Sequence, residues 1–109
     1  MSRFARQRGF LKSILNEAKH KERQQQLNHA NKDQINAVSE LVLNFLKFNI
    51  PTPPHVIKQL APYKKSLRDI AKRSHSVKRR KNILKQQTGG GFWKGLNHCY
   101  NKACRKNKY

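Results

Sequence analysis

The stretch QINAVSELVLNFLK, residues 34–47, carries the strongest helical pattern in the chain. Its apolar residues recur at spacings of three and four, which predicts a helix with one wide apolar face. Asn31 and Asp33 are residue types that begin helices well, and Lys47 suits the negative end of a helix. Burying the apolar face could contribute on the order of 10 kcal/mol before conformational entropy is subtracted. The helix is therefore expected to be the hydrophobic centre, through Ile35, Val38, Leu41, Val42, Phe45 and Leu46.

Two further helices are predicted on the N-terminal side of this centre. Residues 10–19 place apolar side chains at helical spacing, and residues 21–30 form a charged second helix. One continuous helix over both segments is the alternative. Residues 1–9 carry three arginines and little apolar content, so a mobile basic arm is expected there.

Prolines divide the next part of the chain. The segment NIPTPP, residues 49–54, must end the central helix, but Pro54 can begin a short helix of its own. Pro62 then ends that helix and opens another, and Ser74 or Ser76 can cap a last helix over residues 77–86. The side chains expected to face inward from these helices are Val56, Ile57, Leu60, Tyr63, Leu67, Ile70, Ala71, Val77, Ile83 and Leu84.

These patterns predict an all-α fold, a small bundle of four to six short helices over residues 10–87. No alternating pattern is long enough to suggest a sheet. Each glycine costs roughly 1 kcal/mol inside a helix, so the run Gly89–Gly91 is expected to be extended and exposed. Residues 88–91 would form a linker, and residues 92–109, which are basic and aromatic, would form a flexible tail.

Charge dominates the composition. The chain has 25 lysines and arginines against 5 acidic residues, a formal net charge of +20 that repels itself unless an anion neutralises it. Nucleic acid is the expected partner, and a membrane is not, because no helix combines bulky apolar residues with a basic face over many turns. The N-terminus lacks the apolar core of a secretory signal, so a nuclear or cytosolic location is expected.

The positive charge is densest over residues 64–85, where ten cations face only Asp69. Such a cluster predicts a phosphate-binding face that recognises duplex DNA without reading its sequence. Trp93 and Tyr100 could stack on bases, or pack on the protein's own core. The predicted nucleic-acid-binding residues are Lys64, Lys65, Arg68, Lys72, Arg73, Lys78, Arg79, Arg80, Lys81 and Lys85.

The sequence offers few residues arranged for catalysis or for metal binding. The five acids are scattered, and no serine or cysteine has a base and an orienting group in a recognisable pattern. His98, Cys99 and Cys104 would need a fourth ligand such as His75, and their spacing matches no complete zinc signature. The protein is therefore expected to be non-enzymatic, with no catalytic residues, no metal and no cofactor.

The segment Gln87, Thr88, Gly89, Gly90 and Gly91 resembles the cleavage consensus of adenovirus-type cysteine proteases. By that resemblance a viral cysteine protease would cut after Gly90. The same QQTGG is similar to the processed tail of small ubiquitin-like modifiers, although this chain lacks their strand pattern. A plain glycine linker or helix stop is the structural alternative.

More broadly, NAVSELVLNFLKFNIP, APYKKSLRDIAKR and KRRKNILKQQTGGGF resemble small basic proteins of adenovirus-like mobile elements and adintoviruses, the Polinton or Maverick group. The layout is also loosely similar to an adenovirus core-protein precursor. The resemblance implies a virion core or packaging protein that neutralises DNA, is processed at the glycines and meets capsid proteins in the virion and host nucleus. The alternatives are a cellular nucleic-acid-binding module, ribosomal-type or helix-turn-helix-like, and a membrane-active peptide released as residues 91–109.

Overall fold

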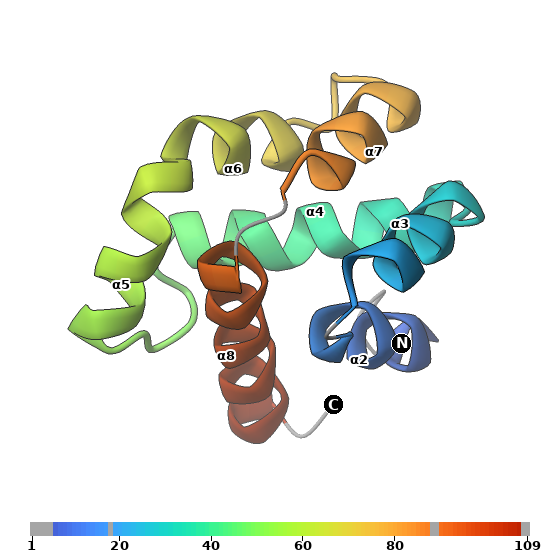
Figure 1. Ribbon diagram of the computed structural model, residues 1–109. Coiled ribbons are helices and arrows are strands. Elements are labelled where there is room, and N and C mark those ends of the chain that lie inside the picture. The colour runs from blue at the N-terminus through green and yellow to red at the C-terminus, as the bar shows by residue number, and fades with distance from the viewer. Residues whose placement is uncertain (1–5, 18, 88–89, 108–109) are drawn as a thin grey trace.

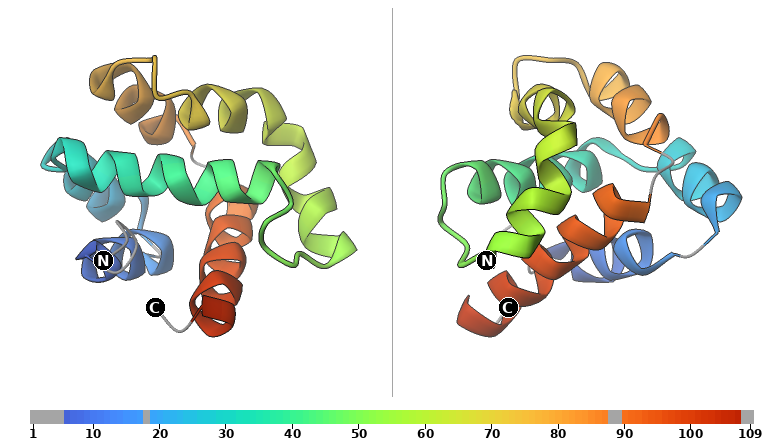
Figure 2. Two further views of the ribbon diagram at one scale, coloured as in Figure 1. Left: turned by 180° about the vertical axis from the view of Figure 1, so that it is seen from behind. Right: turned by 60° about the vertical axis from the view of Figure 1, so that its left-hand side comes forward.

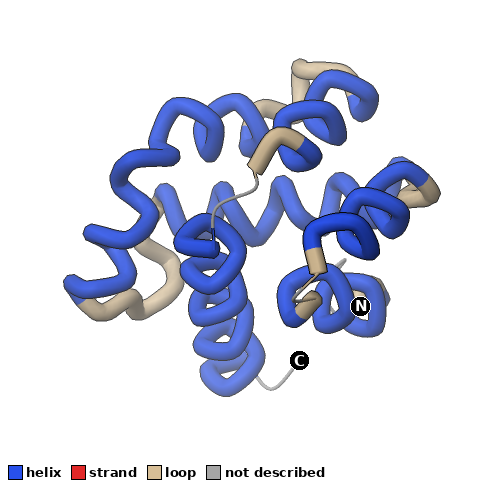
Figure 3. Tube along the Cα trace, in the orientation of Figure 1, coloured by secondary structure: helices blue, strands red, loops and turns tan. Residues whose placement is uncertain are grey.

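The computed structural model describes residues 6–17, 19–87 and 90–107, with side chains up to residue 103 (Figure 1). Every regular element in this part of the chain is helical, which confirms the all-α prediction (Figure 3). The principal extents are 32 × 30 × 29 Å. In chain order the elements are α2 (Arg8–Asn16), α3 (His20–Asn28), α4 (Lys32–Leu46), α5 (Pro54–Leu60), the 3-10 turn η1 (Ala61–Tyr63), α6 (Lys64–Ala71), α7 (Val77–Lys85) and α8 (Gly90–Asn107).

Helix α4 is the centre of the fold, as its pattern predicted. Helices α6 and α7 pack on one side of it, and α2 and α8 pack on the other (Figures 1 and 2). Burial therefore extends beyond the predicted apolar stripe, and Leu46 at its edge is only partly covered. The buried residues of α4 are Ile35, Asn36, Ala37, Val38, Ser39, Leu41, Val42 and Phe45.

Both ends of α4 are closed by local hydrogen bonds. At the start, the Asn31 side chain accepts from the Gln34 amide at 2.9 Å, and the Gln34 side chain accepts from the Asn31 amide at 2.8 Å, which is a capping box. At the end, the Phe48 amide donates to Phe45 and the Asn49 amide to Asn44, the pair of bonds that defines a Schellman motif. Phe48 occupies the position in that motif where glycine is usual, with φ of 58°.

The N-terminal helices are two, not one. Glu17 and Lys19 both have extended backbone angles, so the alternative of one continuous helix over residues 10–30 is wrong. Helix α2 also begins earlier than expected, at Arg8, so Arg8 and Gly9 belong to the helix and not to a basic arm. Residues 1–5 of the expected arm lie outside the described residues.

Pro54 acts as predicted, whereas the helix that Pro62 was expected to open begins two residues later, at Lys64. Pro54 is the first residue of α5, and Pro62 lies in η1, which joins α5 to α6. Val56 and Leu60 of α5 are buried, but Ile57 is 38% exposed, so the expectation that it faces inward is wrong. Ile57 lies at an apolar surface groove described below, where nothing covers it within the described part of the chain.

The flexible tail expected over residues 92–109 is wrong for the part that the structure describes. Residues from Gly90 to Asn107 form the longest helix, α8, which packs against α2, α4 and α5 (Figure 2). Its apolar residues recur at helical spacing, and burying them outweighs the roughly 1 kcal/mol that each glycine costs in a helix. The buried side chains of α8 include Phe92, Trp93, Leu96, Cys99, Tyr100 and Ala103.

Gly95 explains how closely α8 approaches α5. A Cβ atom at this position would lie 2.6 Å from both Cγ and Cδ2 of Leu60, far inside van der Waals contact. Leu60 is 1% exposed and has little room to move. A residue without a side chain is therefore required where the two helices cross.

Candidate nucleic-acid interface

Seven of the ten predicted cations are exposed on α6, on α7 and on the turn between them. On α6, the cations follow each other at spacings of about one turn, opposite the buried Leu67 and Ile70. Helices α6 and α7 lie on the same side of α4, so their outer surfaces form one region of the molecule (Figure 1). We call this region the basic face; its cations are Lys64, Lys65, Arg68, Lys72, Arg73, Lys78 and Arg79.

The start of α7 adds to the positive potential of the basic face. The Ser76 hydroxyl caps the helix by accepting from the Arg79 amide at 3.0 Å. Lys78 and Arg79 then lie in the first turn, which has no acidic residue. Cations at this end of a helix oppose the helix dipole, at a cost of about 0.3–1 kcal/mol each, whereas an anion is favoured there.

Little on the protein neutralises these cations. Asp69 is the only acidic residue between residues 64 and 85, and its carboxylate lies 3.7 Å from Nε2 of His75. Among the described residues, this is the closest contact between an acidic and a basic side chain. Within the described residues, no acidic side chain therefore lies within 4.0 Å of a cation of the basic face.

Arg80 does not belong to the interface, contrary to the prediction. It is 2% exposed, and its guanidinium donates to Asn36 at 2.9 Å, to Ser39 at 2.7 Å and to the His75 carbonyl at 3.2 Å. Burial lowers the pKa of Arg80, and the nearby positive charge of Arg73 lowers it further. The residue connects α7 to the polar side of α4 and cannot reach a phosphate.

Lys81 and Lys85 are also less available than predicted. The Lys81 ammonium donates to the carbonyls of Asn28 at 3.3 Å and Ala30 at 2.9 Å, where it complements the negative end of α3. Lys85 is partly buried, and its carbonyl accepts a hydrogen bond from the Gln24 side chain. The Lys81 side chain and the backbone carbonyl of Lys85 thus help to hold α3 against α7, whereas the Lys85 side chain stays partly exposed.

A shallow depression between α6 and α7 brings in residues that a search for charge missed. Asn82 and Gln86 line it together with Lys78, Arg79, Ser76, Ile83 and the acidic Asp69. Asn82 and Gln86 follow Lys78 at successive spacings of four, a helical signal that the sequence already contained. Their amide groups can both donate and accept hydrogen bonds.

In the described part of the expected cleavage segment, which is Gln87, Gly90 and Gly91, the chain is more ordered than predicted. Gly90 and Gly91 form the start of α8, and a Cβ on Gly91 would touch the Gln59 and Tyr63 side chains. Before them, the Gln87 side chain donates to the Ile83 carbonyl at 2.9 Å, and the Trp93 indole donates to the Gln87 carbonyl at 2.8 Å. Thr88 and Gly89 lie outside the described residues.

The cysteine and histidine residues show no metal-binding arrangement within the described residues. Cys99 is fully buried, and burial raises the pKa of its thiol to about 11, partly offset by a hydrogen bond with the Thr52 side chain. His98 lies against His55, with ring centroids 5.9 Å apart. The Cys104 side chain is outside the described part.

The candidate aromatic stacking residues lie in the core. Trp93 is 2% exposed, and the guanidinium carbon of Arg23 lies 4.4 Å from its ring centroid. Arg23 also donates to the Ile14 and Glu17 carbonyls at the end of α2. Tyr100 is equally buried, so neither aromatic residue is placed to stack on a base.

Comparison with known proteins identifies no relative. No family model, curated protein or solved structure matches the chain. Among the described residues, no helix has the length and apolar character that crossing a membrane requires.

Proposed function

We propose that this protein is a non-enzymatic nucleic-acid-binding protein that neutralises duplex DNA through the basic face, without reading its sequence. The observation that carries the proposal is the set of seven exposed cations on α6, α7 and their connecting turn, opposed only by Asp69. Cations held this close repel one another, and binding of a polyanion removes that repulsion. Side chains of lysine and arginine contact backbone phosphates readily, and such contacts carry no sequence information.

The geometry sets the expected salt dependence. Each phosphate neutralised on duplex DNA contributes a slope of about −0.9 to the plot of log affinity against log salt concentration. If all seven cations of the basic face engage, the slope should be about −6. The net charge of +20 would predict a far steeper slope if charge acted without regard to position.

A charge-matched pair of variants tests this proposal. The double substitution Arg73→Ala and Arg79→Ala removes two cations of the basic face, and we expect the slope to become shallower by about 1.8. The control Lys12→Ala and Lys94→Ala removes two exposed cations from α2 and α8. The control should change the slope much less, and equal slopes for the two variants would refute a localised interface.

The resemblance to proteins of adenovirus-like elements supplies a biological setting for this proposal. In that setting the protein would package DNA in a virion and be cut by a viral cysteine protease after Gly90. Because Gly90 and Gly91 begin a packed helix, cleavage would require the first turn of α8 to open. The protein fragment beyond the cut would carry Phe92, Trp93 and other core residues, so it should stay bound to the rest.

A cellular nucleic-acid-binding module is the second candidate, favoured by the side chains around the depression between α6 and α7. Asn82 and Gln86 lie beside Lys78 and Arg79 there, and asparagine and glutamine are residues that pair with adenine edges. A selection of random duplexes separates the two functions. Recovery of one preferred sequence would favour the second candidate, and recovery of none would favour packaging.

A further inference from the structure

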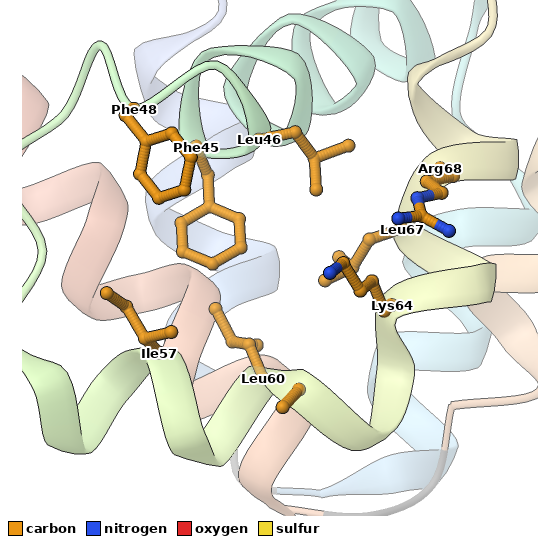
Figure 4. A pocket seen from close by; sticks show the side chains of 9 residues that line it. Phe45, Leu46, Phe48, Ile57, Leu60, Lys64, Leu67 and Arg68 are labelled. Carbon is orange, nitrogen blue, oxygen red and sulfur yellow. The ribbon is translucent and has the colours of Figure 1, made fainter.

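An apolar groove of about 410 Å³ lies between the end of α4, helix α5 and the start of α6 (Figure 4). Phe45, Leu46 and Phe48 line one wall, and Ile57, Leu60 and Leu67 line the others. Phe48 is 79% exposed and Ile57 38% exposed, and these are the large apolar residues most open to solvent in the described part of the chain. The volume lies within the range of about 300–1,000 Å³ that is typical of ligand sites.

The backbone at Phe48 indicates that this exposure is not accidental. Its φ of 58° is the left-handed conformation at the end of α4, where glycine would be free of strain. A phenylalanine there strains the backbone and leaves its ring exposed to water. Local sequence choices that lower stability without any gain in packing are expected at functional sites.

The charges around the groove are all of one sign. Lys64 and Arg68 line its end on α6, where Figure 4 shows both side chains directed towards the apolar space. Exposed Lys47 and Lys58 lie next to the lining residues in the sequence, and no acidic residue lines the groove. A second copy of this chain is a poor occupant, because a body with a net charge of +20 would be repelled.

We propose that this groove docks an acidic amphipathic helix of a partner protein. Two or three large apolar side chains of the partner, spaced at i, i+3, i+4 or i+7, would pack against Phe45, Phe48 and Ile57. Carboxylates flanking those side chains would pair with Lys64 and Arg68. The inference does not require DNA binding, because the apolar residues Phe48 and Ile57 lie outside the basic face. Lys64 and Arg68 belong to both the groove and the basic face, so an acidic helix and duplex DNA would compete for these two cations.

The test uses two synthetic peptides of identical composition. The first is a helical peptide with leucine at the i, i+3, i+4 and i+7 positions and glutamate elsewhere, and the second has the same residues in scrambled order. Binding is measured by fluorescence polarisation at about 0.15 M salt, where the Debye length of about 8 Å limits long-range attraction. We expect the patterned peptide to bind at least about tenfold more tightly than the scrambled one.

The variant Phe48→Gly separates docking from folding. Glycine relieves the backbone strain, so the melting temperature should rise, while affinity for the patterned peptide should fall by about fivefold to tenfold. The double variant Lys64→Ala and Arg68→Ala should also weaken the patterned peptide, whereas the control Lys12→Ala and Lys94→Ala should not. Unchanged peptide binding by Phe48→Gly, or equal binding of the two peptides, would overturn the proposal.

Other occupants give distinguishable results. If Phe48→Gly weakens binding to duplex DNA instead, the groove belongs to the nucleic-acid interface and the proposal fails. Stronger Phe48-dependent binding to vesicles of phosphatidylserine and phosphatidylcholine than to the peptide would assign the groove to a membrane surface. A dimer in sedimentation that is lost in Phe48→Gly would assign it to a second copy.

Discussion

Replacing Arg80 tests whether the neighbouring residues Arg79 and Arg80 have different roles, one in binding DNA and the other in stabilising the fold. Arg79 is exposed on the basic face, whereas the Arg80 guanidinium is buried and donates to Asn36, Ser39 and a backbone carbonyl. In the variant Arg80→Met, the new side chain fills the space of the arginine stem but leaves Asn36 and Ser39 without their donor. The variant Arg79→Ala is the adjacent control.

The magnitude follows from the hydrogen bonds that are lost. Each buried polar group left without a partner costs about 1–3 kcal/mol, so two such groups cost about 2–6 kcal/mol. Removing a desolvated charge recovers part of this, since burial already disfavours the charged guanidinium. We therefore expect Arg80→Met to lower the free energy of unfolding by about 2–4 kcal/mol, out of a total of about 5–15 kcal/mol for a domain of this kind.

Urea and thermal unfolding followed by circular dichroism measure this change. For a chain of about 100 residues, a loss of 2 kcal/mol lowers the melting temperature by about 8 °C or more. The triple variant Arg80→Met, Asn36→Leu and Ser39→Ala removes donor and acceptors together and should recover most of the stability. Arg79→Ala should leave the melting temperature within about 2 °C of the parent and reduce the DNA salt slope. Equal melting temperatures for Arg79→Ala and Arg80→Met would refute the assigned roles.

Three further predictions concern α8. Gly95→Ala should lower the free energy of unfolding by up to about 2 kcal/mol, because the new Cβ would clash with Leu60. Gly91→Ala, where a Cβ has room, should raise it by up to about 1 kcal/mol. Urea titration of the two variants and the parent measures both changes. Burial raises the pKa of the Cys99 thiol to about 11, so this thiol should be unreactive in the folded protein. In the variant Cys104→Ser, iodoacetamide at pH 8 should therefore label Cys99 only as the protein unfolds. Immediate labelling would contradict this. After cleavage at Gly90, the two fragments should elute together in gel filtration, and separate elution would contradict the packing of α8.

The helices with a regular apolar pattern were predictable from the sequence, because burial and periodicity agree there. The stripe of α4 runs from Ile35 to Phe45 and is buried as expected. Pro54 marks the start of α5, and Pro62 lies in the turn η1 that follows it. Proline restricts the backbone locally, so these boundaries can be predicted without knowledge of tertiary contacts. The all-α class follows from these local signals.

Helix α8 was not predicted, because the glycines disfavour a helix locally and the burial of the apolar residues that follow them compensates for this cost. The glycines predict a chain break, but Phe92, Leu96, Cys99 and Ala103 follow each other at spacings of four, three and four. The sequence contains this apolar stripe, but the lysines between its members give the segment a polar, basic appearance. The contacts of Gly95 with α5 depend on the distant Leu60, and no local pattern could reveal them.

Whether a cation of the candidate interface is exposed could be predicted for most of the ten residues and not for all of them. Charge density singles out residues 64–85, but it cannot separate exposed cations from buried ones. Arg80 lies three residues after Val77 and four before Leu84, so helical periodicity places it on the inward face. Phe48 gave no comparable signal, because its conformation results from the hydrogen bonds that end α4.

The packing of α8 also bears on when the chain can fold during its synthesis. Helices α2, α4 and α5 all precede α8 in the chain, and each packs against it. A nascent chain that has emerged only as far as residue 87 lacks six buried side chains of the core, including Phe92 and Trp93. We expect such a chain to remain sensitive to protease while ribosome-bound and to become resistant only after residue 103 has emerged. Contacts between elements far apart in sequence are thus expected to delay folding until translation has passed α8.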